Sequence, residues 1–378
     1  MVFYFYFRMA IKIPYLSLEY QNRLIRNEAL QAMEEVWEAQ WYILGEQLQA
    51  FEKDYAAFTG TAHCCGVGNG FDALYIALKV LGLGPGNEVI VPAHTFIATW
   101  LAVSHTGATP VPVEPRYDTC NLDPGKIESA ITARTKAILP VHLYGQACEM
   151  EAIMAIAQKY QLYVVEDNAQ AQGARYKNQL TGSFGHLNAT SFYPTKNVGA
   201  FGDGGAITTQ QKDLARQVRA FRNYGSEVKY QHDQLGVNSR LDEIQAALLR
   251  VKLPYLQKWT TERQHLARLY HASLQDLLEL LLPVTASGAT HVYHIYQVRT
   301  PHRDKLQAYL SYRGIETQIH YPVPPHLQKA YESRGLVAGT FPVAEEIART
   351  GLSLPLWPGL KEDQVRYVCA CIRDFFKK

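Results

Sequence analysis

The sequence is poor in cysteine, and its cysteines have no metal-binding or disulfide-forming spacing. The 378 residues include six cysteines, and no two of them form a CxxC pair. A zinc centre or a disulfide framework would need a regular set of such spacings. We therefore expect no metal site, and we interpret the six thiols as reduced groups of a cytoplasmic protein.

Excess charge of one sign and long apolar runs are also missing. Lysine and arginine total 37 against 35 acidic residues, which gives a net charge of +2, and the longest basic run is the terminal Lys377-Lys378. This excludes nucleic acid or an anionic membrane as a bulk partner. No apolar run is long enough to cross a bilayer. The apolar residues 1–8 precede a more natural start at Met9, and we interpret them as an extension with no role in the fold.

The length and the hydrophobic content, 47% of residues, are sufficient for two domains with a sizeable core. Short apolar runs alternate with amphipathic stretches through the first two thirds of the chain, which indicates an α/β domain with a mainly parallel sheet. We predict strands at residues 63–67, 89–91, 109–113, 137–141, 162–166, 189–193 and 205–209. Ligands of such folds bind beyond the carboxyl ends of the strands.

The pattern changes in the last third of the chain. Two long helices, 241–257 and 262–282, are followed by predicted strands at 291–300 and 315–319, with helices at 302–312 and 362–376. We place a large domain at residues 9–257 and a smaller C-terminal α+β domain at 258–378.

A lone lysine, Lys196, lies in a glycine-rich stretch that follows the predicted strand 189–193. Glycines at 199, 202, 204 and 205 let the backbone approach a ligand closely. A lysine that is desolvated and lacks a charge partner has a lowered pKa and can form a Schiff base. The alternative is a surface lysine on a flexible loop, and the choice depends on further sites.

Two of these sites flank predicted elements. Gly70, Phe71 and Asp72 open a helix after a glycine turn, where backbone N–H groups and the helix dipole attract a phosphate. A predicted apolar strand runs into Asp167, whose carboxylate needs a cation such as a protonated pyridine nitrogen. Capping of a following helix is the alternative role for Asp167.

Three more residues complete a pattern. Gln170 follows Asp167 by one turn and would donate to a phenolate oxygen, while Ser191 would add a hydroxyl to the phosphate. Phe96 either stacks on a flat ring or belongs to the core. Together with Lys196 and Asp167, these are the parts of a site for pyridoxal 5′-phosphate (PLP).

Seven sequence motifs resemble the DegT/DnrJ/EryC1/StrS family of fold-type I, PLP-dependent nucleotide-sugar aminotransferases. The likeness covers nearly the whole chain from about residue 13. The motifs are GNGFDAL (68–74), PAHTF (92–96), PVHLYG (140–145), EDNAQ (166–170), SFYPTK (191–196), NSRLDEIQAA (238–247) and GIETQIHYP (314–322).

The resemblance implies a role for each matching residue. Lys196 would hold PLP and shuttle the proton, Asp167 would pair with the pyridine nitrogen, and Gln170 would bond the ring hydroxyl. Phe96 would stack on the ring. Phosphate contacts would come from the backbone of Gly70, Phe71 and Asp72 and from Ser191.

The remaining implied roles concern the partner subunit and the substrate. Asn238 would reach the phosphate of the neighbouring subunit's cofactor, which makes a homodimer with shared active sites the functional unit. His320 and Tyr321, with Tyr224 and Arg240, would bind the nucleotide sugar. Phe71 departs from the family pattern, because many relatives carry threonine there; the phosphate then depends more on backbone donors.

The resemblance also favours a reaction. Relatives with histidine in place of the lysine dehydrate the sugar, so Lys196 favours ping-pong transamination with L-glutamate as donor. The motifs are most similar to those of enzymes that aminate C3 of dTDP-3-keto-6-deoxyhexoses, whose products feed lipopolysaccharide, S-layer or antibiotic sugars. The residues give no physical reason for C3 over C4 of a dTDP- or UDP-4-keto-6-deoxy sugar. The nucleotide base and the C4 stereochemistry also stay open.

Two other classes of function compete with this one. A non-catalytic PLP-fold regulator would not need Lys196, Asp167 and Gln170 together. A nicotinamide dehydrogenase would need a G-x-G-x-x-G turn, and the chain has Gly68-Asn69-Gly70 followed by Phe71-Asp72-Ala73 instead.

Overall fold

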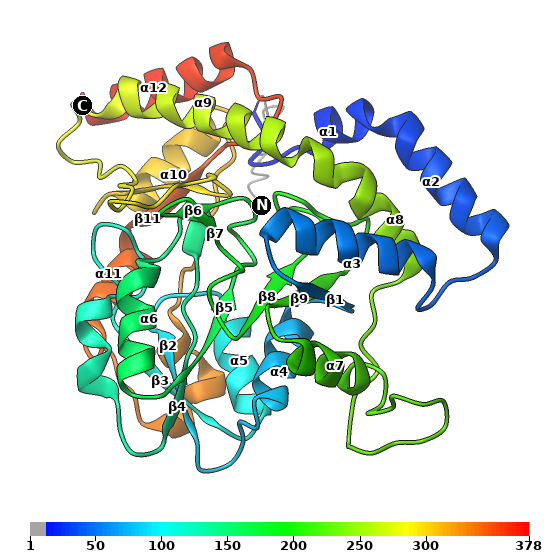
Figure 1. The fold of residues 1–378 in the computed structure, drawn as a ribbon. Helices are drawn as coiled ribbons and strands as arrows, with labels where there is room; N and C mark the ends of the chain where they lie inside the picture. Colours follow the sequence, from blue (N-terminus) through cyan, green and yellow to red (C-terminus); the bar gives the residue numbers. More distant parts are fainter. Residues whose placement is uncertain (1–12, 378) are drawn as a thin grey trace, which may run out of the picture.

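The computed structural model describes residues 13–377, so the extension expected at residues 1–8 lies outside it (Figure 1). Its centre is a seven-stranded sheet in which only β9 runs antiparallel to its neighbours. The predicted mainly parallel sheet is confirmed. The strand order is β1 (His63–Val67), β9 (Gly205–Thr209), β8 (Leu187–Ser191), β5 (Tyr163–Asp167), β4 (Thr135–Ile138), β2 (Glu88–Pro92) and β3 (Thr109–Val113).

Helices cover both faces of this sheet, because successive strand residues point to opposite sides. Val89, Val91 and Val165 pack on one core, whereas Ile90 and Val164 belong to another. The first face is covered by α4 (Gly70–Val80), α5 (Ala98–His105) and α7 (Lys212–Phe221), and the second by α6 (Met150–Lys159), α3 (Glu46–Thr59) and α8 (Glu243–Lys252). Strands buried on both faces explain the continuous apolar runs of the sequence.

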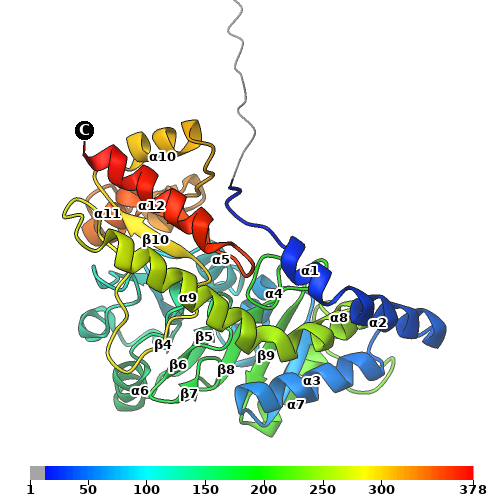
Figure 2. The same cartoon turned by 90° about the horizontal axis from the view of Figure 1, so that it is seen from above.

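The C-terminal part has its own core around a two-stranded antiparallel sheet, β10 (Tyr296–Arg299) and β11 (Gly351–Leu354). Helices α9 (Leu256–Leu274) and α12 (Glu362–Phe376) lie side by side over it (Figures 1 and 2), and Ile13 from the start of the described chain joins the same core. The domain boundary at 257/258 stays a prediction. The other helices are α1 (Glu19–Leu24), α2 (Arg26–Ala39), α10 (Arg303–Tyr312) and α11 (Pro342–Thr350).

Two helices end earlier in the structure than the sequence predicts, and local contacts explain both differences. The helix expected at 241–257 ends at Lys252, because Pro254 lacks the N–H that an α-helix needs and a short 3-10 turn, Leu253–Tyr255, leads into α9. The helix expected at 262–282 ends at Leu274, and Leu281 instead pairs with Arg299.

Two strands predicted for the C-terminal part are shorter than expected or missing. The strand at 291–300 shrinks to β10, because residues 292–295 bond to the backbone of Tyr144 and Gly145 rather than to a neighbouring strand. The stretch 315–319 makes only single bridges, from Ile315 to Ile13 and from Gln318 to Ser353. Between residues 13 and 377, no helix combines the length and apolar character needed to cross a bilayer.

A buried carboxylate joins α3 and α8, the two helices that pack together against one face of β1 and β9. Glu243 of α8 accepts the N–H groups of Gly45 (2.8 Å), Gln47 (2.8 Å) and Leu48 (3.1 Å) at the start of α3. The first turn of a helix has unpaired N–H groups and a partial positive charge, and a carboxylate satisfies both. This single side chain replaces the local capping residue that Gly45 cannot provide.

We expect Glu243→Gln to lower the free energy of unfolding by about 2 kcal/mol, because an amide accepts fewer of these bonds and carries no charge. Urea denaturation followed by circular dichroism measures the change. Glu34→Gln, at an exposed position of α2, is the control and should change stability by less than about 0.5 kcal/mol. Equal midpoints for the two variants would contradict the capping role.

Candidate active site

A cavity of about 440 Å³ lies at the carboxyl ends of the parallel strands and the N-terminus of α4. The C-terminal part closes one side of it. The residues that line this cavity include Gly70, Phe71, Thr95, Phe96, Asp167, Gln170, Ser191, Lys196, Asp203, His294, His320 and Tyr321. The position agrees with the rule for ligand sites in open α/β sheets.

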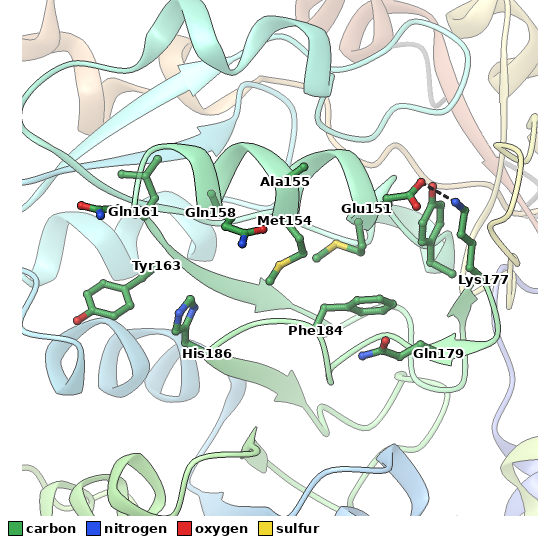
Figure 3. Close-up of a pocket in the computed structure, with 14 residues that line it drawn as sticks. Glu151, Met154, Ala155, Gln158, Gln161, Tyr163, Lys177, Gln179, Phe184 and His186 are labelled. Carbon is green, nitrogen blue, oxygen red and sulfur yellow. Dashed lines mark hydrogen bonds and ion pairs between the residues drawn. The ribbon is translucent and has the colours of Figure 1, made fainter.

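A larger groove, of about 820 Å³, lies elsewhere, between α6 and the hairpin of β6 (Arg175–Tyr176) and β7 (Gln179–Leu180). Figure 3 shows Met154, Phe184 and His186 facing this groove and Glu151 paired with Lys177 at one end. The charges of that pair satisfy each other, and none of the residues singled out from the sequence lies there. Chemistry rather than size therefore locates the active site.

Lys196 lies on a turn directly after β8. Its N–H donates to the carbonyl of Tyr193 (2.8 Å), and the turn is tight because a Cβ on Gly199 would lie 2.3 Å from the carbonyl oxygen of Pro194. Burial lowers the pKa of the Lys196 ammonium to about 8, and the negative charge of Asp167 opposes this shift. About a tenth of the amine is therefore neutral at pH 7, far more than for an ordinary lysine.

Asp167 ends β5 as a buried carboxylate. Its Oδ2 accepts the hydroxyl of Thr99 (3.0 Å) and its Oδ1 accepts the N–H of Ala169 (3.2 Å). Burial raises its pKa, although these bonds and the charge of Lys196 act in the opposite direction. No helix follows Asp167, so the alternative of a helix cap is wrong.

The N-terminus of α4 and Ser191 approach each other closely at the wall of the cavity. A Cβ on Gly70 would lie 2.5 Å from that of Ser191, so only glycine fits. Asn69 caps the helix by accepting the N–H of Asp72 (2.8 Å), and the Asp72 carboxylate accepts the hydroxyl of Ser239 (2.6 Å). Asp72 therefore has a structural partner, and Gly70 and Phe71 carry the first-turn N–H groups that lack an intrahelical acceptor.

Gln170 connects two parts of the site. Its Oε1 accepts the N–H of Tyr144 (2.6 Å), and its Nε2 donates to the hydroxyl of Tyr321 (2.9 Å). The Phe96 ring is 52% exposed and lies 5.3 Å from the ring of Tyr321, so the alternative of a core phenylalanine is wrong. His320 is held by Ser353, whose Oγ lies 2.8 Å from its Nδ1.

Comparison with known proteins decides the family. The model of the DegT/DnrJ/EryC1/StrS aminotransferase family matches residues 23–373. The chain belongs to this family. The sequence is 48% identical, over 97% of both chains, to the dTDP-3-amino-3,4,6-trideoxy-alpha-D-glucose transaminase of Streptomyces venezuelae. It is 46% identical, over 96% of this chain and 99% of the relative, to the dTDP-3-amino-3,6-dideoxy-alpha-D-galactopyranose transaminase of Aneurinibacillus thermoaerophilus.

Solved structures agree with this assignment. DesV of S. venezuelae, crystallised with a ketimine intermediate, matches with a TM-score of 0.95 and 48% identity over 97% of this chain and 99% of its own. NtdA of Bacillus subtilis, with bound cofactor PMP, matches with a TM-score of 0.91 and 32% identity over 98% of this chain and 87% of its own. The predicted fold-type I architecture is confirmed. One relative, 45% identical over 97% of this chain and 99% of its own length, is named a pleiotropic regulatory protein (Geobacillus stearothermophilus).

Four predicted site residues of this aminotransferase do not line the cavity of their own chain: Asp72, Tyr224, Asn238 and Arg240. Asn238 is exposed and pairs with Asn223 in a single bridge. Arg240 donates to the Asn223 side chain (3.0 Å), and its guanidinium lies 5.6 Å from the centre of the Tyr224 ring. Tyr224 begins the loop 224–237, and Asn238 and Arg240 lie just after it. This loop extends away from the body of the molecule beyond α7 (Figure 1).

Several residues of the site were not expected from the sequence. Asn69, directly before the start of α4, is a capping signal that can be recognised in the sequence. Thr99 lies on α5, one turn after Thr95. Its hydroxyl can donate to Asp167 only because β5 brings that carboxylate beside it. Tyr144 and His294 give no local signal, because distant segments bring them to the site. Among residues 13–377, no group of His, Cys, Asp and Glu side chains could hold a metal ion.

The lowered pKa of Lys196 gives a direct prediction for the cofactor-free enzyme. Only the neutral amine reacts with acetic anhydride, so labelling of Lys196 should rise through about pH 8. Lys177, whose pKa is raised by Glu151, should react only above the ordinary lysine range. In Asp167→Asn the opposing charge is lost, and the midpoint of Lys196 should move further down. Mass spectrometry of labelled peptides measures both lysines in one sample, and coincident profiles would refute the assignment.

Proposed function

We propose that this aminotransferase transfers an amino group from L-glutamate to C3 of a dTDP-3-keto-6-deoxyhexose, with PLP as its cofactor. The observation that carries the proposal is the placement of Lys196, with its lowered pKa, beside the buried carboxylate of Asp167 in a cavity that ends at the start of α4. The overall reaction converts glutamate and the keto sugar into 2-oxoglutarate and the amino sugar.

The residues of the cavity fit PLP. The N–H groups of Gly70 and Phe71, with the Ser191 hydroxyl, would hold the phosphate at the helix N-terminus. Asp167 would face the pyridine nitrogen, because a buried carboxylate with a raised pKa is stabilised by a cation. Phe96 would stack on the ring. When bound, PLP supplies the electron sink that transamination requires.

The chain's own residues supply the proton transfer. As a neutral amine, the Nζ of Lys196 can accept the proton that leaves the amino-bearing carbon of the donor, and it returns a proton after the amine has moved. The pKa of about 8 keeps both protonation states accessible near neutral pH. Burial lowers the pKa of His320 to about 4, so this substrate-side residue contributes a neutral ring.

The choice of C3 is supported by the relatives, two of which are named for 3-amino sugars of dTDP. The regulatory name of one relative does not favour a second function here, because this chain retains the complete set of Lys196, Asp167 and Gln170. A cytoplasmic setting is part of the proposal, and six free, buried cysteines support it.

A charge count supports a homodimer with shared active sites. Of the residues that line the cavity, Lys196 is the only lysine or arginine, against the two acids Asp167 and Asp203. A cofactor phosphate and a nucleotide diphosphate need further cations or donors. Asn238 and Arg240, at the base of the extended loop 224–237, would supply them to the partner's cavity.

The substrate can be tested with the holoenzyme and glutamate. We expect amination of dTDP-3-keto-6-deoxyhexoses, both C4 epimers being assayed, at least about tenfold faster in kcat/KM than that of dTDP-4-keto-6-deoxyglucose. Product analysis by mass spectrometry and NMR gives the carbon that carries nitrogen. Preference for the 4-keto sugar would move the reaction to C4.

The matched variant for this assay is Lys196→Ala, which should lose amination of every keto sugar. Borohydride reduction of the wild-type holoenzyme should leave a pyridoxyl group on Lys196 and on no other lysine. A Lys196→Ala protein that retains the full rate would overturn the mechanism rather than only the choice of sugar.

Shared sites predict complementation between two inactive variants. Asn238→Asp would place a carboxylate near the partner's phosphate, and Lys196→Ala removes the catalytic amine. A mixed dimer keeps one intact site, so an equilibrated equimolar mixture should regain about a quarter of the wild-type activity. If both residues served the same chain's site, the mixture would stay inactive.

A further inference from the structure

His294 lines the cavity of Lys196 but comes from a distant part of the chain. It lies in residues 292–295, just before β10, and this segment is bound to the turn that follows β4. The N–H of Val292 donates to the carbonyl of Gly145 (2.8 Å), and that of Ile295 donates to the carbonyl of Tyr144 (3.2 Å). The approach is so close that a Cβ on Gly145 would lie 2.9 Å from the backbone nitrogen of His294. The backbone of His294 is therefore held firmly against the turn.

The imidazole contacts the residue next to the catalytic lysine. Asn197 is 2% exposed, and its Oδ1 lies 3.2 Å from the Nδ1 of His294. The Nδ2 of Asn197 has no partner, so within residues 13–377 this is the only hydrogen bond of that side chain. An amide oxygen can only accept, and Nδ1 therefore carries the proton. The Nε2 of His294 is then the unprotonated nitrogen of a neutral ring.

The surroundings keep His294 neutral. Burial lowers its pKa well below the usual range, and the positive charge of Lys196 acts in the same direction. Two other titratable groups whose charges act on Lys196 or are acted on by it are Asp167, from β5, and His320, from the stretch after α10. Asp203 and Tyr321 also line the cavity. His294 thus adds a hydrogen bond at the lysine turn without adding a charge that would repel the ammonium.

We propose that His294 is a positioning residue for Lys196, acting through its hydrogen bond to Asn197. The bond ties the turn that carries Lys196 to residues 292–295 and so holds the amine in its buried place beside Asp167. The other side-chain anchors of this stretch lie further along it, where Gln172 bonds the backbone of Val198 and Lys252 donates to the carbonyl of Gly199. Without the His294–Asn197 bond, the residue next to Lys196 has no side-chain tie, and the lysine gains access to water. The catalytic meaning of this tether rests on the proposed function, whereas the tether itself concerns only the chain.

The test compares four variants of the full-length enzyme, first without cofactor. His294→Ala and Asn197→Ala each remove one partner of the bond. His294→Asn retains an N–H donor at the position of Nδ1. His291→Ala is the matched control, because His291 is a buried histidine of the same stretch that accepts the N–H of Tyr293 and does not line the cavity.

The first readout is the pH midpoint of Lys196 acylation, measured by peptide mass spectrometry. We expect His294→Ala and Asn197→Ala to raise this midpoint by about one unit, because an amine that reaches water regains its charge more readily. His294→Asn and His291→Ala should keep the wild-type midpoint, even if His291→Ala lowers the melting temperature.

The second readout is steady-state kinetics of the holoenzyme. We expect kcat to fall about 10- to 100-fold in His294→Ala and to recover largely in His294→Asn, with the KM for glutamate changed less than about threefold. If His294→Ala does not fold, Asn197→Ala carries the same prediction, since it leaves the imidazole in place.

Three results would overturn the proposal: an unchanged midpoint in both alanine variants, an equal shift in His291→Ala, or failure of His294→Asn to restore the midpoint. The last two would show that packing, not the hydrogen bond, holds the turn. Failure of the borohydride reaction at Lys196 would refute the proposed function alone, because the acylation midpoint needs neither cofactor nor substrate.

Discussion

The site depends on keeping one amine and one carboxylate buried together at the end of a parallel sheet. Burial alone would drive Lys196 to lose its proton and Asp167 to gain one. Each charge opposes the pKa shift that burial imposes on the other group, and the bonds of Asp167 to Ala169 and Thr99 act on its pKa in the same direction as Lys196. Asp167 owes its position to β5, and Lys196 owes its position to the turn after β8. Pairing of these neighbouring strands is what creates the chemistry.

Close approach of backbone is the second requirement. The start of α4 lies against Ser191 and above Gly205, where a Cβ would come within 2.3 Å of the carbonyl oxygen of Asn69. Glycine at 70 and 205 allows the helix N-terminus to lie at the wall of the cavity. Asn69, which itself lines the cavity, caps the helix at the N–H of Asp72 and leaves the N–H groups of Gly70 and Phe71 for a ligand.

The turn at Tyr144 connects the sheet with the C-terminal part. The Tyr144 hydroxyl donates to the carbonyl of His320, its backbone bonds Gln170 and Ile295, and its φ of 59° is one that few non-glycine residues adopt. Gly145, at a φ of 101°, completes the turn. Residues from three distant stretches, Gln170, His294 and His320, are thereby held around the same space. An enzyme that closes its site with a separate core needs such a connection.

The sequence by itself determined the sheet, the strand ends that carry ligand groups, and the candidates Lys196, Asp167, Gly70 and Ser191. Strand and helix periodicities are local, and the chemistry of a lone lysine among glycines is visible without a fold. It did not determine the roles of Thr99, Tyr144 and His294, which have no local signal. Their hydrogen bonds span 68 residues for Thr99 to Asp167 and 97 for His294 to Asn197. Nor did it show that Tyr224 and Arg240, unlike His320 and Tyr321, lie outside their own cavity. Only tertiary structure decides these points, because the packing of distant segments sets which polar groups meet.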